Sequence, residues 1–248
     1  MEILIAGHSG VIGSSLYKYL TNPNSFKNLN ETINIIGLDS KNLDLTNESK
    51  IEQFISTYEK FDILIYLVAL AHSKGNKNDF FIHEEINYKT LINTIRVLKR
   101  YDKIPQKIIY TSTISVYGER IDQEYYNEDL LPRPFSPYAK SKYKAENFLL
   151  KYYKNKTWIL RLAPVYSKDF LLNINRRTKI GLVNYKVGYG NKKLSLCNIK
   201  NIHKVVRNVI TGNIPPDIYN VSDKISYTYN ILIGGNKPVL RIPRFIIW

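Results

Sequence analysis

Two motifs bring hydroxyl, phenol and ammonium groups into positions where they can move a proton on an alcohol. Thr111-Ser-Thr113 ends the hydrophobic strand that begins with Lys107-Ile-Ile-Tyr110, and it does so with hydroxyl side chains. Tyr138 and Lys142 are four residues apart, which places them on one face of a helix. A neighbouring ammonium group favours the phenolate form of tyrosine, so Tyr138 can take a proton from an alcohol or return it to a ketone. With Thr113 holding the same oxygen, the pattern predicts redox chemistry on an alcohol.

The Tyr-xxx-Lys spacing is a weak signal by itself, because the chain has 20 Tyr and repeats the spacing at Tyr152/Lys156 and Tyr189/Lys193. Two observations single out Tyr138. It follows Thr113 by 25 residues, and the chain opens with a nucleotide-binding pattern. We therefore expect the catalytic residues to be Thr113, Tyr138 and Lys142.

The nucleotide-binding pattern is a short apolar segment followed by Gly7-xx-Gly10-xx-Gly13 and a helical sequence. The glycines permit a tight turn, close approach of the backbone to a pyrophosphate, and packing of the helix on the strand. The helix N-terminus offers free N–H groups to phosphates. The alternative is an ordinary strand–turn–helix connection. The flanking strand and helix favour a dinucleotide site with contacts from Gly7, Ser9, Gly10, Val11, Ile12 and Gly13.

A second predicted strand, 33–38, ends at Asp39. A carboxylate there accepts hydrogen bonds from the adenosine ribose and repels a 2′-phosphate, which favours NAD over NADP. Ser40 and Lys41 follow at once and can accommodate a phosphate, so NADP(H) stays open. Asp44 is expected near the adenine, followed by Leu45. Either aspartate can instead cap a turn or a helix.

Length and composition indicate one compact α/β enzyme. The chain has 248 residues, 44% of them hydrophobic, which suffices for a sizeable core. The longest apolar run, 63–71, is half the length needed to span a bilayer and is interpreted as a buried parallel strand. No signal peptide is evident, and the single Cys197 is typical of a cytoplasmic protein. The histidine spacing predicts no metal site.

The net charge of +15 has three interpretations: nucleic-acid binding, an anionic small-molecule substrate, or a coding bias toward lysine. The charges are scattered, without a long basic run or interleaved aromatics. Positive charges are most frequent in the last third of the chain, at Arg176-Arg177, Lys192-Lys193, Lys204 and Arg207. Coding bias and nucleotide-diphosphate binding are favoured, and nucleic acid is the minor interpretation.

Strand and helix patterns alternate along the chain. This alternation predicts a doubly wound parallel sheet with right-handed crossovers and helices on both faces. We expect a dinucleotide-binding domain over 1–166 and a small substrate-binding region over 167–248 that is partly interleaved with it. The predicted strands are 1–6, 33–38, 62–68, 107–112 and 157–162, and the predicted helices lie near 11–21, 47–58, 85–101 and 138–153.

The chain resembles the extended short-chain dehydrogenases/reductases, in the NAD-dependent epimerase/dehydratase family that acts on nucleotide sugars. The resemblance implies a Rossmann-type fold and covers nearly the whole chain, most clearly its first 166 residues. The matching residues are Gly7-xx-Gly10-xx-Gly13, Asp39, Asp44-Leu45, Leu67-Val-Ala-Leu-Ala-His72, Asn87, 111–118, Tyr138-xxx-Lys142, Leu160-Arg-Leu-Ala-Pro-Val-Tyr166 and 218–222.

The resemblance also implies residue roles. The Tyr138 phenolate would remove a sugar hydroxyl proton while hydride passes to the nicotinamide, and Lys142 would bind the nicotinamide ribose and hold the phenolic pKa down. Further cofactor contacts are implied at Ala69, Ala71, Asn87, Lys142, Leu162 and Pro164. Substrate contacts are implied at His72, Ser73, Thr113, Asp169, Arg176, Lys193 and Arg207.

Departures from the family pattern narrow the expected reaction. Dehydratases of the family carry an Asp-Glu pair directly after the threonine, whereas this chain has Ile114 and Ser115, so dehydration is not expected. The short connection from Asp39 to Asp44 resembles members that reduce 4-keto sugars. Asp169 stands where many relatives carry a phosphate-contacting asparagine. At the segment 237–248, which ends this chain, relatives of the family continue with further helix. The resemblance therefore implies either a minimal or a truncated member of the family.

The expected function is NAD(P)-dependent oxidation or reduction of a nucleotide-diphosphate sugar. The reaction would be 4-keto reduction or 4-epimerisation in the biosynthesis of a surface polysaccharide such as O-antigen or capsule. A redox-inactive dinucleotide sensor or scaffold of the same fold is the alternative. We expect a homodimer through the helices near 85–101 and 138–153, no nucleic-acid partner and no membrane span.

Overall fold

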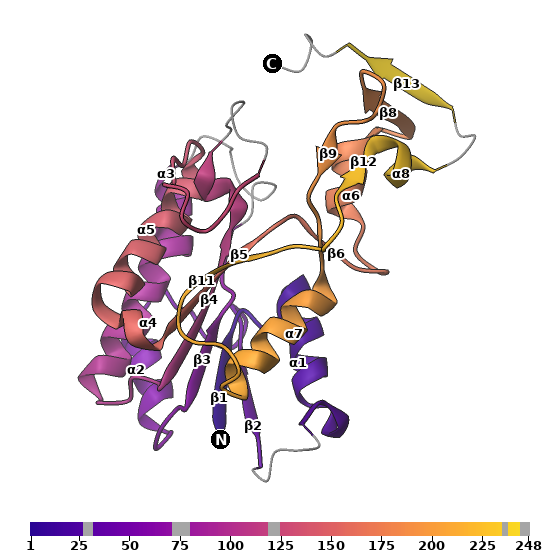
Figure 1. Ribbon diagram of the computed structural model, residues 1–248. Coiled ribbons are helices and arrows are strands. Elements are labelled where there is room, and N and C mark those ends of the chain that lie inside the picture. The colour runs from indigo at the N-terminus through magenta and orange to yellow at the C-terminus, as the bar shows by residue number, and fades with distance from the viewer. Residues whose placement is uncertain (27–31, 71–79, 119–124, 235–237, 244–248) are drawn as a thin grey trace. The chain divides into compact units, whose positions relative to one another are not determined.

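The computed structural model describes residues 1–26, 32–70, 80–118, 125–234 and 238–243 (Figure 1). The chain forms two compact units. The first comprises Met1–Arg161 and His203–Asn220, and the second comprises Leu162–Ile202 and Val221–Trp248. The second unit begins at Leu162. The chain then returns to the first unit because one more helix and strand complete its layers.

A six-stranded sheet forms the centre of the first unit, in the order β11-β5-β4-β3-β1-β2. The β1–β2, β1–β3 and β3–β4 pairs are parallel, as the alternating pattern predicts. Ala6 lies opposite Leu38 and Tyr66, and Tyr66 lies opposite Tyr110, so these strands end at one common edge. The strands are β1 (Glu2–Ala6), β2 (Asn34–Leu38), β3 (Ile63–Tyr66), β4 (Lys107–Thr113), β5 (Thr157–Leu162) and β11 (Ile218–Val221).

Helices cover the sheet because its central strands are apolar on both faces. In Figure 1, α2, α4 and α5 lie on one side of the sheet and α1 and α7 on the other. Ile51 of α2, Ile95 of α4 and Leu149 of α5 join Leu64 and Ile108 in one buried cluster. The helices are α1 (Val11–Leu20), α2 (Glu48–Ser56), α3 (Phe80–Glu84), α4 (Thr90–Arg100), α5 (Pro137–Tyr153) and α7 (Ile199–Ile210), with the π-helical η2 (Glu85–Lys89) and the 3₁₀ turns η1 (Pro23–Phe26), η3 (Ile114–Tyr117) and η4 (Lys154–Lys156).

The described residues of the second unit form short strands and the two short helices α6 and α8. Its three small sheets have the orders β10-β6, β12-β9 and β13-β8-β7. Asp223 holds its segments together: Oδ1 accepts from the Asn198 backbone and Asn201, and Oδ2 accepts from the hydroxyls of Tyr166 and Tyr227. The elements are β6 (Val165–Tyr166), α6 (Leu172–Thr178), β7 (Lys179–Ile180), β8 (Val183–Val187), β9 (Lys193–Leu194), β10 (Cys197–Asn198), β12 (Tyr227–Thr228), α8 (Tyr229–Ile233) and β13 (Val239–Ile242). Within the described parts of the chain, every helix is too short or too polar to cross a membrane.

Candidate active site

The glycine turn between β1 and α1 is fixed by close backbone contacts. Gly7 has φ 89°, and a Cβ there would lie 3.0 Å from the Leu67 backbone. A Cβ on Gly13 would overlap the Gly7 carbonyl oxygen and lie 2.6 Å from the Cα of His8. Gly10 caps α1 without any side-chain hydrogen bond, so the first N–H groups of the helix, at Val11 and Ile12, have no side-chain cap. The turn can therefore offer backbone donors and a helix N-terminus to a phosphate.

Asp39 follows β2 beside this turn. Its Oδ1 accepts from the backbone N–H groups of Lys41 (2.9 Å) and Asn42 (3.2 Å). The Lys41 hydrogen bond, with further hydrogen bonds from the Ser9 side chain and the Asn42 backbone, holds the pKa of the Asp39 carboxyl below its ordinary value. Asp39 therefore caps its turn as an ionised carboxylate, and its link to Ser9 ties the turn to the glycine loop.

Asp44 also caps a turn. Its Oδ1 accepts from the Thr46 hydroxyl (2.7 Å) and the Thr46 backbone N–H (3.0 Å), and these bonds lower the pKa of the carboxyl. The neighbouring Leu45 is buried in the cluster formed by the sheet and α2. Asp44 thus caps a turn and Leu45 packs in the core.

Asn87 links the segment that follows β3 to α5. It is fully buried in the π-helical turn η2, and its Oδ1 accepts from the Leu70 backbone (2.6 Å). Its Nδ2 donates to Ser141 Oγ (3.1 Å), and Ser141 Oγ donates to the Tyr138 carbonyl (2.8 Å). Asn87 thus supports the turn of α5 that carries Tyr138. Ala69 is exposed beside Leu70, whereas Ala71, His72 and Ser73 lie outside the described residues.

Thr113 is the last residue of β4 and caps the 3₁₀ turn η3. Its Oγ1 accepts from the Ser115 backbone N–H (3.2 Å) and lies 3.2 Å from Ser115 Oγ. The next helix of the unit, α5, begins with Ser136 Oγ accepting from the Ala139 backbone (3.1 Å) and with Pro137 in its first turn. These local signals place Tyr138 and Lys142 in the first turns of α5.

Lys142 is a buried cation that lacks a hydrogen-bond partner. Its Nζ lies 4.2 Å from the centre of the Tyr110 ring and makes no hydrogen bond with any described residue. Desolvation lowers the pKa of Lys142 to about 7, although the Glu146 carboxylate acts in the opposite direction. A buried ammonium group without an acceptor is costly, so the position fits a ligand that brings oxygen acceptors, such as a ribose.

The pKa of the Tyr138 phenol differs from the expectation. Burial raises the pKa of Tyr138 to about 12, whereas the resemblance implied that Lys142 would lower it. The reason is that desolvation disfavours the phenolate, while the same burial leaves Lys142 only partly charged near neutral pH. His83 packs edge-on against the Tyr138 ring, with centroids 6.2 Å apart.

A buried polar network lies along α5 and β5, and the sequence analysis missed it. Arg161 Nη2 donates to Glu146 Oε2 (2.7 Å), and Arg161 Nη1 donates to the Tyr117 hydroxyl (2.9 Å). Ser112 also donates to Glu146, and Tyr117 donates to Asn220 Oδ1 (2.8 Å). The available signals were a carboxylate four residues after Lys142 and an arginine inside an apolar strand.

The remaining candidates are distributed over both units. Leu162 ends β5 and Pro164 follows it, while Asp169, Arg176 and Lys193 are exposed residues of the second unit. Arg207 is on α7 in the first unit, and its Nε donates to the Ser25 carbonyl (3.0 Å) beyond the end of α1. The structure therefore does not bring Arg207 together with Thr113, since α1 runs from the glycine turn toward the opposite edge of the sheet.

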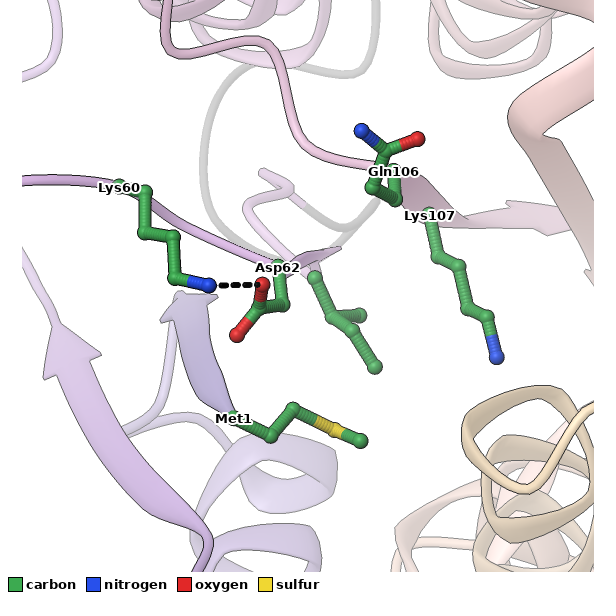
Figure 2. Close-up of a pocket in the computed structure, with 6 residues that line it drawn as sticks. Met1, Lys60, Asp62, Gln106 and Lys107 are labelled. Atoms are coloured by element: carbon green, nitrogen blue, oxygen red, sulfur yellow. Dashed lines mark ion pairs between the residues drawn. The ribbon is translucent and has the colours of Figure 1, made fainter.

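A hollow of about 380 Å³ lies at that opposite edge, where the strands begin (Figure 2). Asp62 there pairs with Lys60 (3.3 Å) and accepts from the Glu2 backbone (2.7 Å). Lys107 Nζ donates to the carbonyls at the end of α7. Asp62, Lys60 and Lys107 of this hollow are thus engaged within the fold. Ligands of open α/β sheets bind at the carboxyl ends of the strands instead. The hollow is lined by Met1, Lys60, Asp62, Ile63, Gln106 and Lys107.

The parallel sheet, the glycine turn and the Tyr-xxx-Lys helix together define a dinucleotide-binding oxidoreductase fold. The model of the NAD dependent epimerase/dehydratase family matches residues 3–222, and the chain belongs to that family. The predicted family and fold class are therefore confirmed.

Known relatives span several reactions of the family. A dTDP-D-glucose 4,6-dehydratase of Mus musculus is 29% identical over 70% of this chain and 50% of its own length, so the chain spans about half of that relative. An N-acetyl-α-D-glucosaminyl-diphospho-ditrans,octacis-undecaprenol 4-epimerase of Escherichia coli O157:H7 is 22% identical over 94% of this chain and 70% of its own. The crystal structure of the UDP-glucose 4-epimerase of Thermus thermophilus with NAD has a TM-score of 0.75, at 20% identity, over 98% of this chain and 86% of that one. At that identity the structural likeness shows the fold.

Proposed function

We propose that this protein is an NAD(P)-dependent oxidoreductase that acts on a nucleotide-diphosphate sugar by 4-keto reduction or 4-epimerisation. The observation that carries the proposal is the buried Lys142 ammonium group, which lacks an acceptor one helical turn from Tyr138. Thr113 ends the neighbouring strand β4, and Lys142 lies against Tyr110 of that strand. A proton donor, a second hydroxyl and a cation are thus supplied from two adjacent elements.

The same edge of the sheet fits a dinucleotide. The α1 N-terminus at Gly10 suits the pyrophosphate, and Asp39 suits the adenosine ribose, which favours NAD. Lys142 would donate to the nicotinamide ribose, which supplies the acceptor it lacks. When bound, the nicotinamide accepts or donates the hydride.

The chain's own groups supply the proton chemistry. Thr113 would donate a hydrogen bond to the reacting oxygen, and Tyr138 would take its proton during oxidation or return one during reduction. Hydrogen bonds from Lys142 to ribose hydroxyls would favour its charged form, and that charge would lower the pKa of Tyr138 from its value in the ligand-free protein. Binding of the dinucleotide would therefore prepare the base.

Dehydration is disfavoured although the mouse relative is a dehydratase. Elimination of water needs an acid and a base beside the sugar. Ile114 cannot titrate, and Ser115 is hydrogen-bonded to Thr113 within η3. Reduction and epimerisation need only the Thr113, Tyr138 and Lys142 groups.

The proposal extends to the substrate and the setting. The Escherichia coli relative is named for a sugar carried on a polyprenyl diphosphate. That sugar and a nucleotide-diphosphate sugar share a diphosphate group. Arg176 and Lys193 would contact that diphosphate. We place the reaction in surface-polysaccharide biosynthesis in the cytoplasm. A redox-inactive sensor of the same fold is the alternative, and it would not require the Tyr138 hydroxyl.

The first experiment is mass spectrometry and absorbance of the cofactor released from freshly purified, denatured protein. Stoichiometric NAD would support a 4-epimerase, because an epimerase recycles its cofactor. Protein without cofactor that oxidises NADH or NADPH in the presence of a UDP-4-keto sugar would support the reductase. Absence of any dinucleotide binding would contradict the proposal.

Replacing Tyr138 separates the enzyme from the sensor. Tyr138→Phe should lower kcat by about 10²–10⁴-fold, because only the proton-transfer group is removed. Dinucleotide affinity should stay unchanged in a titration of cofactor fluorescence. Tyr152→Phe is the matched control, since it has the same Tyr-xxx-Lys spacing but lies exposed at the end of α5. A Tyr138→Phe protein that keeps full biological function would support the sensor.

A further inference from the structure

The β7–β8 hairpin of the second unit ends in an exposed apolar tip. Ile180 and Val183 are cross-strand partners that are 55% and 53% exposed, and Leu182 between them is 99% exposed. Gly181 has φ 60°, which suits the first central position of a tight two-residue turn. The tip Ile180-Gly-Leu-Val183 therefore presents three apolar side chains and no polar one.

Packing does not account for these residue types. A side chain that is 99% exposed contacts almost nothing in the fold, so the second turn position would accept a polar residue without loss of packing. Among the described residues, β7 is an edge strand of its sheet, and exposed edge strands usually carry charge that prevents association. An apolar cluster at such an edge indicates an interaction surface.

The surroundings of the tip are strongly cationic. The second unit has 12 Lys and Arg against two Asp and no Glu, a net charge of +10 in 69 residues. The rest of the chain has 24 against 19, a net charge of +5. The sheet β13-β8-β7 contains Lys179, Lys186 and Arg241 and no carboxylate. Asp223, one of the two acids, is hydrogen-bonded on both oxygens.

Apolar side chains that project from a cationic surface fit an anionic lipid bilayer. Leucine, isoleucine and valine enter the boundary between headgroups and acyl chains, while lysine and arginine bind lipid phosphates. The same cationic unit of a second copy would bring the same positive charge and be repelled at this tip. A nucleic acid would gain nothing from an aliphatic tip, because bases stack on aromatic side chains.

We propose that the β7–β8 hairpin docks this protein peripherally on an anionic membrane through Ile180, Leu182 and Val183, with Lys179 at the lipid phosphates. The contact lies outside the catalytic residues and does not depend on the reaction proposed above. It would give the enzyme access to sugars carried on lipid diphosphates, whose headgroups lie at the membrane surface.

The test is co-sedimentation of the intact chain with phosphatidylcholine vesicles, with or without phosphatidylglycerol. At low salt the partition coefficient should be at least about tenfold higher on the anionic vesicles, and it should fall as salt screens the lysines. Leu182→Ser should lower binding by about tenfold, because one leucine no longer leaves water. Ile225→Ser, at a 62% exposed isoleucine of another loop, should leave it unchanged.

Equal binding to neutral and anionic vesicles, or anionic binding that Leu182→Ser leaves intact, would overturn the proposal. Self-association that depends on Leu182 in sedimentation velocity, without vesicle binding, would also overturn it and assign the tip to a second copy. Lys179→Gln provides a second variant that leaves the turn unchanged. Dinucleotide binding measured on the same preparations tests the proposed function separately, so either proposal can fail while the other stands.

Discussion

The burial of Lys142 has a cost in stability, and the proposed function gives a reason for it. Its ammonium group is withdrawn from water, faces the Tyr110 ring and has no hydrogen-bond acceptor among the described residues. Folding therefore favours the neutral amine, which is the form least useful for lowering the pKa of Tyr138. A ligand oxygen would reverse this preference, so under the proposed function the ligand-free site holds Lys142 ready for the cofactor at the expense of stability.

Removal of the charge should therefore stabilise the protein. The folded-state pKa of Lys142 is lowered to about 7, so between that value and its ordinary 10.5 the unfolded chain binds more protons than the folded one. The contribution of Lys142 to the free energy of unfolding consequently rises with pH through this window. Lys142→Met should raise the free energy of unfolding at pH 7 by roughly 2 kcal/mol or more, and by less as pH approaches 10.

Urea denaturation from about pH 6 to pH 10 measures this effect. The substitution should also abolish turnover, because Lys142 is the proposed ribose ligand. A variant that is less stable than the natural protein at pH 7 would show that Lys142 is a structural residue held by contacts other than those described.

At the scale of elements, the turn between β1 and α1 depends on Gly13 more than on Gly10. A Cβ on Gly13 would overlap backbone atoms of the turn, whereas a Cβ on Gly10 would meet the Gly7 carbonyl at an ordinary 3.4 Å. Backbone cannot move aside as a flexible side chain can. The two glycines of one motif thus have different structural roles.

Gly13→Ala should displace α1 from the sheet and cost about 1–3 kcal/mol or more of folding stability, as overpacking does. Gly10→Ala should change stability by less than about 1 kcal/mol. Thermal denaturation compares the two. Equal stability losses for both variants would contradict the close contact at Gly13.

The Glu146–Arg161 pair joins α5 to β5 in the interior. Both side chains are almost fully buried, and Ser112 and Tyr117 satisfy their remaining groups. A buried pair of this kind adds little net stability, but removal of one partner leaves an uncompensated charge. Glu146 also supports the charged form of Lys142, one turn earlier on the same helix.

Glu146→Gln should lower the free energy of unfolding by about 3–5 kcal/mol, because the Arg161 charge stays buried. Glu85→Gln, which breaks the exposed i,i+4 pair with Lys89, is the control and should cost about 0.5 kcal/mol or less. Denaturant titration at neutral pH measures both. A small loss for Glu146→Gln would mean that water or another group satisfies Arg161.

For the whole molecule, the expected assembly is a homodimer. The hypothesis places α4 and α5 at the interface, and α5 presents an exposed Tyr152 near its end. Light scattering should give twice the chain mass of 28.9 kDa. A single monomer peak at micromolar concentration would exclude dimerisation through these helices. Mass measured with and without dinucleotide would show whether the cofactor affects assembly.

The sequence alone determined the order of the strands in the chain, the parallel class of the sheet, and the local geometry of the glycine turn and of Tyr138 and Lys142. These features follow from short-range rules, because apolar runs mark buried strands and spacing along a helix fixes which residues share a face. The family assignment, made from the same motifs, is confirmed by the match over residues 3–222.

Only the tertiary structure decided which distant groups meet and how buried they are. The sequence does not show that Arg161 pairs with Glu146, that Arg207 reaches the Ser25 carbonyl, or that residues 203–220 return to the first unit. The opposite pKa shifts of Tyr138 and Lys142 arise from desolvation by neighbours that are remote in the chain. Desolvation depends on every atom packed around a group, and a spacing of four residues carries no information about it.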